Sequence, residues 1–252
     1  MIKKGDLVIL FSERRNYLVE VTDKLFHTDK GYIDLKELEQ KNWGEKILTN
    51  KGEVFYILKP TLEDLIMKGV KRFTQIIYPK DAGLIIVKSG INSESKVIEV
   101  GTGAGAFTIA LANFLKPKGK LISYEKRKEF YELAKKNLKK AGVLNFVKLK
   151  NKEVKDRFDE KNVDFIFLDL PTPWELIEAV YKALKPGFRC ASILPTVNQT
   201  EKFVISLKEK GFVNIETIEV LVRRILVREG KTRPEQQMPS HTGYLIFATK
   251  TI

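Results

Sequence analysis

A glycine-rich turn near the middle of the chain constrains the fold more than any other feature of the sequence. It lies between the apolar segment Lys96–Val100, which predicts a buried strand, and Ala106–Leu115, which predicts a helix. Gly101, Gly103 and Gly105 occupy the turn, where the absence of Cβ atoms allows the backbone to approach a ligand closely. From this point onward, predicted strands alternate with predicted helices. The alternation predicts an α/β fold built on a parallel, doubly wound sheet.

The elements of this sheet follow from the same hydrophobic patterns. We expect strands at Lys96–Val100, Lys120–Tyr124, Phe146–Leu149, Val163–Leu168 and Phe188–Leu194, and helices at Ala106–Leu115, Arg127–Ala141, Trp174–Leu184 and Thr200–Lys210. Two late β-rich segments, Val213–Val227 and Gly243–Lys250, predict an antiparallel hairpin at the edge of the sheet. Thr172–Glu175 resembles a capping box with Pro173 at the first helical position, so we expect the Thr172 side chain to cap a helix.

The first seventy residues have a different periodicity. Short segments broken by turns predict a small antiparallel sheet or barrel, at Asp6–Phe11, Asn16–Val21, Gly31–Asp34 and Glu53–Leu58. Helical spacing begins at Leu62–Val70. We therefore expect a small β-rich N-terminal domain at residues 1–68 and a Rossmann-like domain at residues 69–252.

The chain is strongly and unevenly basic. Its 45 Lys and Arg against 32 Asp and Glu give a formal net charge of +13, and residues 116–152 hold 13 of the basic side chains against three acidic ones. A second basic cluster consists of Arg223, Arg224, Arg228, Lys231 and Arg233. Such clusters suit a polyanion, because each neutralised phosphate releases condensed counterions. The alternatives are a solvated lysine-rich helix face for the first cluster and interface salt bridges for the second.

Composition also disfavours several classes of protein. No apolar run approaches the roughly 18 residues that a membrane span requires. The segment Met1–Asp6 reaches an acid before any apolar signal region, so we expect a cytoplasmic protein without a membrane partner. Cys190 is the single cysteine and cannot form an intrachain disulfide or anchor a zinc site. We therefore expect no metal ion.

The glycine turn and the end of the next strand together predict an adenosine-containing cofactor. Glu125 ends that strand, where its carboxylate can accept both ribose hydroxyls. Gly101, Gly103 and Ala106 also satisfy the dinucleotide pattern, which leaves an NAD(P)-dependent oxidoreductase as an alternative. Glu99 favours S-adenosylmethionine instead, because a carboxylate two residues before the first glycine would oppose a pyrophosphate.

A second motif, Asp169–Trp174, directly follows the predicted strand Val163–Leu168. We expect this strand to lie beside Lys96–Val100, the strand that precedes the glycine turn. Ligands of open parallel sheets bind at this switch point, so we expect Asp169 to face the methyl donor. The alternative is an Asp that caps the following helix, which the expected Thr172 cap disfavours. Methyltransferases that modify bases commonly carry an Asp/Asn-Pro-Pro-aromatic motif here, and Asp-Leu-Pro-Thr-Pro-Trp is a narrower version.

Four segments together resemble the TrmI-type tRNA (adenine-N1)-methyltransferases: Thr74–Asp81, the glycine turn with Glu125, Asp169–Trp174, and Arg233–Pro234 with His241–Leu245. The resemblance covers essentially the whole chain. It implies a class I methyltransferase domain, S-adenosylmethionine as cofactor and a homotetramer. It also implies N1 of a T-loop adenosine in tRNA as the target, at position 58 and in archaeal members also at position 57. A different S-adenosylmethionine-dependent methyltransferase, acting on RNA or on a small molecule, and a catalytically silent RNA-binding subunit are the remaining alternatives.

The resemblance assigns cofactor contacts to individual residues. The glycines would approach the methionine end of the cofactor, Glu125 would hold its ribose, and Asp169 would lie at the transfer site. Asn151 and Lys152 stand where many methyltransferases have an Asp near the adenine, and Thr172 replaces the usual acid. The complete set of expected cofactor-binding residues is Glu99, Gly101, Thr102, Gly103, Ala104, Gly105, Ala106, Glu125, Asn151, Lys152 and Asp169.

Asp169 and Tyr78 are the candidate catalytic residues. Asp169 would accept a hydrogen bond from the adenine 6-amino group and stabilise the positive charge that grows on the ring. Tyr78 would stack on the target base, with packing at an interdomain hinge as the alternative. The candidate tRNA-binding residues are Arg223, Arg224, Arg233 and His241. For His241 a structural role at the start of a buried strand is the alternative.

Overall fold

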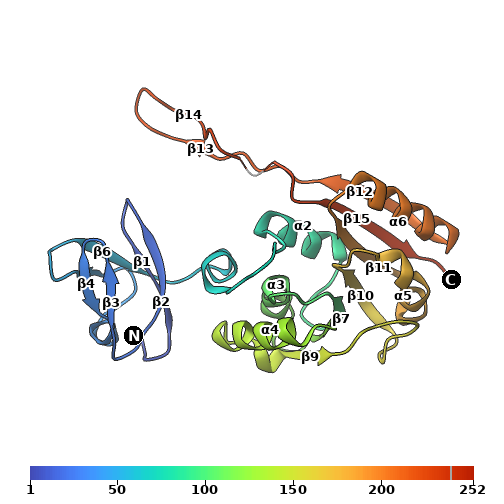
Figure 1. The fold of residues 1–252 in the computed structure, drawn as a ribbon, viewed down its shortest axis with the longest axis horizontal. Coiled ribbons are helices and arrows are strands. Elements are labelled where there is room, and N and C mark those ends of the chain that lie inside the picture. Colours follow the sequence, from blue (N-terminus) through green and yellow to red (C-terminus); the bar gives the residue numbers. More distant parts are fainter. Residues whose placement is uncertain (239) are drawn as a thin grey trace. The chain divides into compact units, whose positions relative to one another are not determined.

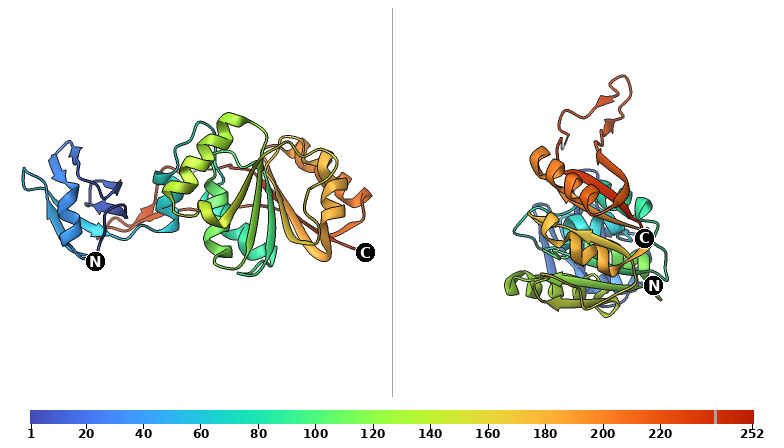
Figure 2. Two further views of the ribbon diagram at one scale, coloured as in Figure 1. Left: turned by 90° about the horizontal axis from the view of Figure 1, so that it is seen from below. Right: turned by 90° about the vertical axis from the view of Figure 1, so that its right-hand side faces the viewer.

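The computed structural model describes residues 1–238 and 240–252, and its main feature is a seven-stranded sheet (Figure 1). The strand order is β12-β15-β11-β10-β7-β8-β9. The five strands from β9 to β11 are parallel to one another, whereas β15 is antiparallel to both of its neighbours. Helices cover both faces of the sheet (Figure 2), which explains why its strands are apolar on both sides. The predicted doubly wound α/β fold is confirmed.

The elements around this sheet follow the order of the chain. They are α2 (Pro79–Ser89), β7 (Lys96–Val100), α3 (Ala106–Leu115), β8 (Lys120–Glu125), α4 (Lys128–Lys140), η3 (Leu144–Phe146), β9 (Val147–Asn151), β10 (Val163–Leu168), η4 (Pro173–Leu176), α5 (Ile177–Ala183), β11 (Leu184–Leu194), α6 (Val197–Glu209), β12 (Phe212–Glu219), β13 (Ile225–Leu226), β14 (Arg233–Pro234) and β15 (Tyr244–Lys250).

Two local predictions in this region are wrong. Thr172 makes no cap hydrogen bond, because its backbone (φ −134°, ψ 60°) lacks the extended geometry of a helix cap and Pro173 begins a 3₁₀ turn instead. The segment Val213–Val227 is not one strand, since β12 ends at Glu219. Strand β13 pairs with β14 in a separate two-stranded ribbon, which extends away from the large sheet (Figure 1).

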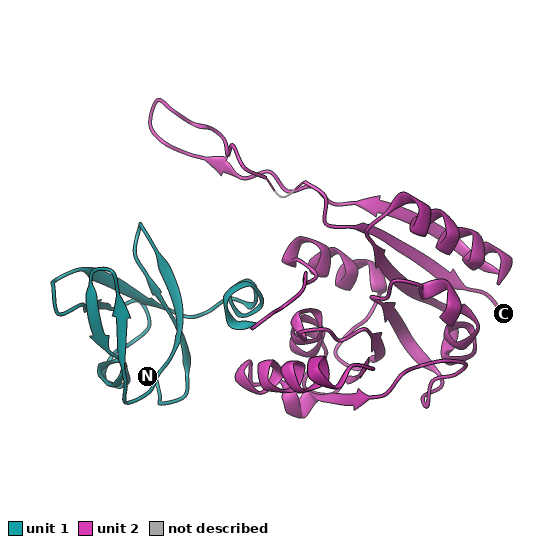
Figure 3. Ribbon diagram, in the orientation of Figure 1, with its two compact units in different colours: residues 1–70 teal, residues 71–252 magenta. Residues whose placement is uncertain are grey.

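The chain divides into two compact units, Met1–Val70 and Lys71–Ile252 (Figure 3). The first unit has its own core, with Val8, Leu10 and Ile57 fully buried, and all its strand pairs are antiparallel. The prediction of a small antiparallel sheet is confirmed, although it missed the short strands β3 and β5. The elements are β1 (Leu7–Phe11), β2 (Asn16–Glu20), β3 (Leu25–Thr28), β4 (Gly31–Asp34), η1 (Leu35–Gln40), β5 (Lys46–Leu48), β6 (Val54–Leu58), α1 (Leu62–Asp64) and η2 (Leu65–Gly69).

A buried asparagine on α4 supports the glycine turn from behind. The Asn137 Nδ2 donates to the carbonyl oxygens of Ala104 and Lys71, each at 2.8 Å, and its Oδ1 accepts from the Lys71 backbone N–H at 3.2 Å. The Asn137 side chain is buried, so water does not reach its hydrogen bond to the Ala104 carbonyl. One amide therefore connects α4, the glycine turn and the segment before α2.

We expect Asn137→Leu, which keeps the size of the side chain, to lower the free energy of unfolding of the second unit by about 1–3 kcal/mol, because the buried Ala104 carbonyl loses its donor. Asn113→Leu on α3 is the matched control. Its Nδ2 donates to Ile109 O of its own helix and its Oδ1 accepts from the exposed Lys116 Nζ, so both contacts are local and we expect a cost below about 1 kcal/mol. Denaturant unfolding of both variants measures the difference, and equal costs would contradict the role assigned to Asn137.

Candidate active site

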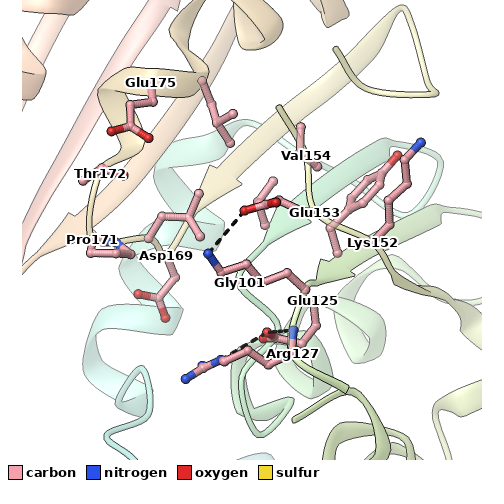
Figure 4. A pocket seen from close by; sticks show the side chains of 15 residues that line it. Gly101, Glu125, Arg127, Lys152, Glu153, Val154, Asp169, Pro171, Thr172 and Glu175 are labelled. Carbon is pink, nitrogen blue, oxygen red and sulfur yellow. Dashed lines mark hydrogen bonds and ion pairs between the residues drawn. The ribbon is translucent and has the colours of Figure 1, made fainter. Parts of the chain in front are cut away.

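Two adjoining cavities open at the carboxyl ends of the parallel strands. The larger, of about 290 Å³, lies over the ends of β7, β8 and β10 and the segment after β9 (Figure 4). The smaller, of about 20 Å³, lies between the glycine turn and residues Gln75, Ile76 and Ile77. Gly101 and Asp169 line both cavities. The chain leaves β7 in one direction along the sheet and β10 in the other, so the site occupies the topological switch point.

The glycine turn is closely packed at its first residue and open at its second. Gly101 has a φ of +93°, and a Cβ there would lie 2.1 Å from the backbone oxygen of Asp169. Gly103 has a φ of +54°, and a Cβ there would meet nothing within 4 Å. Gly103 also lines the smaller cavity. The turn therefore packs on the end of β10 while presenting bare backbone to the space where a ligand would lie.

Glu125 bonds the middle of the glycine turn and the start of the segment after β8, and it faces the larger cavity. Its Oε2 accepts from the Gly103 N–H at 2.9 Å, and its Oε1 accepts from the Arg127 N–H at 3.0 Å. Oε1 also accepts a long hydrogen bond from the Arg127 Nε at 3.5 Å, which a ribose hydroxyl can replace, and Oε2 keeps a second lone pair for the neighbouring hydroxyl. Figure 4 shows Arg127 beside Glu125, and the Arg127 guanidinium also lies 3.7 Å from the centre of the Phe130 ring. The residues present fit an adenosine group.

Glu99 belongs to a buried chain of hydrogen bonds behind the glycine turn. Its Oε2 accepts from the hydroxyls of Thr108 at 2.7 Å and Ser123 at 2.6 Å, and the Ser123 hydroxyl lies 2.6 Å from that of Thr102. Glu99 is 1% exposed and lines the smaller cavity. Burial is the main cause that raises the pKa of the Glu99 carboxyl to about 7, the charges of Asp169 and Glu125 act in the same direction, and the two hydroxyl donors act against it.

The Asp169 carboxylate has no hydrogen-bond partner among residues 1–238 and 240–252. Its backbone N–H donates to Val100 O at 2.9 Å, which fixes the residue at the end of β10. The residue is exposed toward the cavities, while protein atoms crowd its carboxyl group on the other sides. This enclosure raises the pKa of the Asp169 carboxyl to about 6, and the Glu125 charge adds to the shift. Asp169 is thus an acceptor that the protein itself leaves available.

The other expected cofactor residues differ in their placement. Thr102, Ala104 and Ala106 line the smaller cavity, whereas Gly105 begins α3 and packs near Ala134. The Asn151 side chain does not line either cavity, because its Nδ2 donates to the backbone oxygens of Glu125 and Lys126. Lys152 lines the larger cavity and bonds Asp159 at 2.6 Å. The lining residues that the sequence motifs did not single out include Arg127, Glu153 and Val154, which lie two or three residues after the ends of β8 and β9.

Tyr78 and His241 lie beside the site rather than in its walls. The Tyr78 hydroxyl is 3.3 Å from Gln75 Oε1, and Tyr78 is half-buried at the start of α2. The His241 Nδ1 is 2.7 Å from Glu219 Oε1 and its Nε2 is 2.8 Å from Pro195 O. Both partners are hydrogen-bond acceptors. The hydrogen bond to Glu219 is the main cause that raises the pKa of the His241 ring. Neither ring nitrogen is free for an RNA contact in this conformation.

Arg223, Arg224 and Arg233 are exposed residues of the ribbon segment between β12 and β15. They lie away from both cavities, whose linings include none of them. Within residues 1–238 and 240–252, no group of three or more His, Cys, Asp or Glu side chains is arranged to hold a metal ion. No helix in the same ranges is both long enough and apolar enough to cross a membrane.

Comparison with known proteins identifies a family of tRNA methyltransferases and three similar proteins, each described as a methyltransferase. Residues 53–233 match the family described as tRNA methyltransferase complex GCD14 subunit. A tRNA (adenine(57)-N(1)/adenine(58)-N(1))-methyltransferase of Methanocaldococcus jannaschii is 37% identical, over 95% of this chain and 93% of its own length. The solved tRNA (m1A58) methyltransferase of Aquifex aeolicus is 35% identical with a TM-score of 0.88, covering 100% of this chain and 99% of its own. A Thermotoga maritima protein described as an S-adenosylmethionine-dependent O-methyltransferase is 42% identical with a TM-score of 0.94, covering 100% and 95%.

We expect Gly101→Ala to lower the stability of the protein and Gly103→Ala to lower mainly its affinity for S-adenosylmethionine. The Gly101 variant would place a methyl group against the Asp169 backbone, so we expect a loss of stability above about 4 kcal/mol or no soluble protein. The Gly103 variant should fold at a cost of about 1–2 kcal/mol, because only its left-handed backbone is strained. Its methyl group enters the cavity, so S-adenosylmethionine affinity should fall more than about tenfold, or 1.4 kcal/mol. Thermal melts and calorimetric titration test both, and unchanged affinity in Gly103→Ala would move the ligand elsewhere.

The raised pKa of Glu99 predicts a pH-dependent stability. Between about pH 4.5 and 7, the folded protein holds a proton on Glu99 that the unfolded chain releases, so stability is lost as the pH rises through this window. Glu99→Gln removes the charge and should be more stable than the parent by about 1–3 kcal/mol at pH 8, with little difference at pH 4.5. Glu94→Gln, at an exposed side chain, is the control. If Glu99→Gln and the parent differed in stability by the same amount at pH 4.5 and at pH 8, a raised pKa of Glu99 would be contradicted.

Proposed function

The chain belongs to the tRNA methyltransferase complex GCD14 family, and on this premise we propose that it transfers a methyl group from S-adenosylmethionine to N1 of a T-loop adenosine in tRNA. Position 58 is the proposed target, and position 57 is a second one to test, since the Methanocaldococcus relative is described as acting on both. One observation carries the proposal most directly. Asp169, whose carboxylate has no hydrogen-bond partner in the described part of the chain, lines both the cavity that fits an adenosine group and the cavity beside it.

The cofactor contacts are proposed from the walls of the two cavities. Glu125 accepts the ribose hydroxyls, and Val154 and Leu170 supply apolar surface to the adenine ring. Glu99 and the backbone of Gly101 to Ala106 border the methionine end, and Lys152 stands at the rim in place of an acid. When bound, S-adenosylmethionine supplies a methyl group activated by its sulfonium.

The chemistry requires little beyond positioning and charge. Adenine N1 carries a lone pair, so no proton has to be removed from the attacking atom, whereas a hydroxyl acceptor needs a base. Neither cavity lining includes a histidine. Asp169 accepts a hydrogen bond from the adenine 6-amino group and opposes the positive charge that develops on the ring. Tyr78 stacks on the flipped-out base, and the observation that supports this is its place next to Gln75–Ile77.

Binding of tRNA, a homotetrameric state and a cytoplasmic location are also proposals. Support for the RNA surface comes from α4, whose Lys135, Lys136, Lys139 and Lys140 are exposed and pair with no acid in the part of the chain that the structure describes. A third cavity, of about 530 Å³ at the amino ends of β7, β8 and β9, includes Lys96, Lys120 and Lys148 in its lining. The exposed arginines of the ribbon segment add a further set of phosphate-binding groups.

The direct test is incubation of the protein with an unmodified tRNA transcript and S-adenosylmethionine carrying a labelled methyl group, followed by mapping of the modified nucleoside. N1-methyladenosine at position 58 is the expected product. A methylated hydroxyl, or labelling of a small molecule alone, would support the other methyltransferase alternatives. Titration with NAD(H) separates the oxidoreductase alternative, and absence of any transfer despite cofactor binding would indicate a silent RNA-binding subunit.

We expect Asp169→Asn to bind cofactor and tRNA almost normally but to methylate more slowly in single turnover by roughly 10²- to 10³-fold, the scale for loss of one preorganised charge. The amide keeps an oxygen for the 6-amino group, so Asp169→Ala should be slower still. Thermal melts on the same preparations separate chemistry from folding. A folded Asp169→Asn variant with the parental rate would remove Asp169 from the mechanism.

Binding of tRNA should weaken steeply with salt, and the slope of log affinity against log salt should fall by about 0.7–0.9 for each phosphate contact removed. The double variant Arg223→Ala, Arg224→Ala tests the ribbon segment, and Lys135→Ala, Lys139→Ala tests α4. Filter binding over a salt series measures each slope. A slope identical to that of the parent shows that the substituted residues do not contact the RNA backbone.

A further inference from the structure

A buried polar cluster joins the start of α2 to the two ends of the ribbon segment. We call it the root cluster and define it as Lys80, Asp81, Thr242 and the backbone oxygen of Val220. The Lys80 Nζ lies 2.8 Å from Asp81 Oδ1, 2.7 Å from Val220 O and 2.6 Å from Thr242 Oγ1. The Thr242 hydroxyl donates to Asp81 Oδ2 at 2.8 Å. Side-chain exposure is 12% for Lys80 and 0% for Asp81.

The cluster connects a wall of the smaller cavity with the base of the ribbon. Residues Gln75, Ile76 and Ile77 line that cavity together with Asp169, and the chain enters α2 immediately after them. The Tyr78 carbonyl accepts from the backbone N–H groups of Asp81 and Ala82, at 3.0 and 2.9 Å. Val220 directly follows β12, and Thr242 lies two residues before β15. The backbone from Ile77 into α2 and the hydrogen bonds of the root cluster therefore connect the cavity wall with both ends of the ribbon segment.

Stability alone does not explain why such a cluster is buried. Removing two charges from water costs several kcal/mol for each ion, and apolar residues of similar size often stabilise a protein equally well or better. What a buried ion pair with hydrogen bonds to its partners provides is a defined geometry. Its location, between the reaction cavity and the proposed RNA-binding ribbon, indicates what that geometry serves.

The opposite end of α2 provides an internal comparison. There the Lys88 Nζ pairs with Glu216 Oε2 of β12 at 2.8 Å, with side-chain exposures of 27% and 41%. Eight residues separate Lys80 from Lys88, which is about 12 Å along the helix. The same helix is thus joined twice to the region of β12 and β15, once through the buried root cluster and once through a partly exposed group in which Arg189 NH2 also lies 3.9 Å from Glu216 Oε2. Ion pairs that solvent reaches contribute little to stability.

We propose that Lys80, Asp81 and Thr242 are positioning residues, which align the Gln75–Ile77 wall with Asp169 by fixing it to the base of the ribbon segment. The inference rests on the proposed function, because the wall then borders the target base. Thr242 is the best residue to substitute, because its hydroxyl bonds both members of the ion pair and carries no charge itself. Displacement of the wall by about 1 Å is enough to slow a positioned reaction by up to about 10²-fold.

The test compares Thr242→Val, which removes the hydroxyl but keeps the shape of the side chain, with Thr242→Ser, which keeps the hydroxyl. Glu216→Gln at the other end of α2 is the matched control. For Thr242→Val we expect the single-turnover methylation rate at saturating tRNA to fall about tenfold or more, with S-adenosylmethionine affinity within about twofold of the parent. Thr242→Ser and Glu216→Gln should stay within about threefold of the parental rate. Asp81→Asn should repeat the loss of rate wherever melts show that it is folded.

Three results would overturn the proposal. A folded Thr242→Val variant with the parental rate would show that the cluster does not align the site. An equal loss in Thr242→Ser would show that the hydroxyl is not responsible, and an equal loss in Glu216→Gln would show that any contact of α2 has the same effect. Failure of the proposed function is a separate outcome, because the parental protein itself would then leave adenine N1 of tRNA unmodified.

Discussion

The close contact between the glycine turn and the end of β10 determines the geometry of the whole site. Gly101 leaves the space that the Asp169 backbone oxygen occupies, and the Asp169 N–H bonds the neighbouring carbonyl of Val100. Two strands that are distant in sequence and adjacent in the sheet are thereby held with their ends in contact. Because of this contact, one acidic side chain lines both cavities, and donor and acceptor can meet beside it.

The charge around the glycine turn is opposite in sign to the net charge of the chain. The chain carries a formal charge of +13, but Glu99, Glu125 and Asp169 gather three carboxyl groups around the glycine turn. Their mutual repulsion contributes to the raised pKa of Glu99 and of Asp169, after burial itself. A cationic sulfonium relieves that repulsion, whereas a pyrophosphate would add to it. An acidic interior beneath basic exposed surfaces suits a cationic cofactor and a polyanionic substrate.

The scaffold around the site relies on buried polar groups that each serve more than one element. Asn137 joins α4 to the glycine turn, and the root cluster joins α2 to the sequence on both sides of the ribbon. Such groups lose more free energy when half of their bonds are missing than they gain when all are present. They therefore specify one arrangement of the helices and turns that apolar packing alone would leave less well defined.

The local patterns in the sequence determined the elements and the acids that end them. The strand from Lys96 to Val100 and the helix from Ala106 to Leu115 have the predicted bounds, and Glu125 lies at a strand end as expected, because hydrophobic period, glycine and chain direction are local properties. The Thr172 cap failed, since a 3₁₀ turn replaced the expected first turn of the helix. Only the tertiary structure decided that Asn151 connects two strands, that both nitrogens of His241 have partners, and that Lys80 and Asp81 meet Thr242 across 160 residues of chain. These contacts depend on which strands become neighbours and on how tightly a turn packs, and no window of sequence contains both partners.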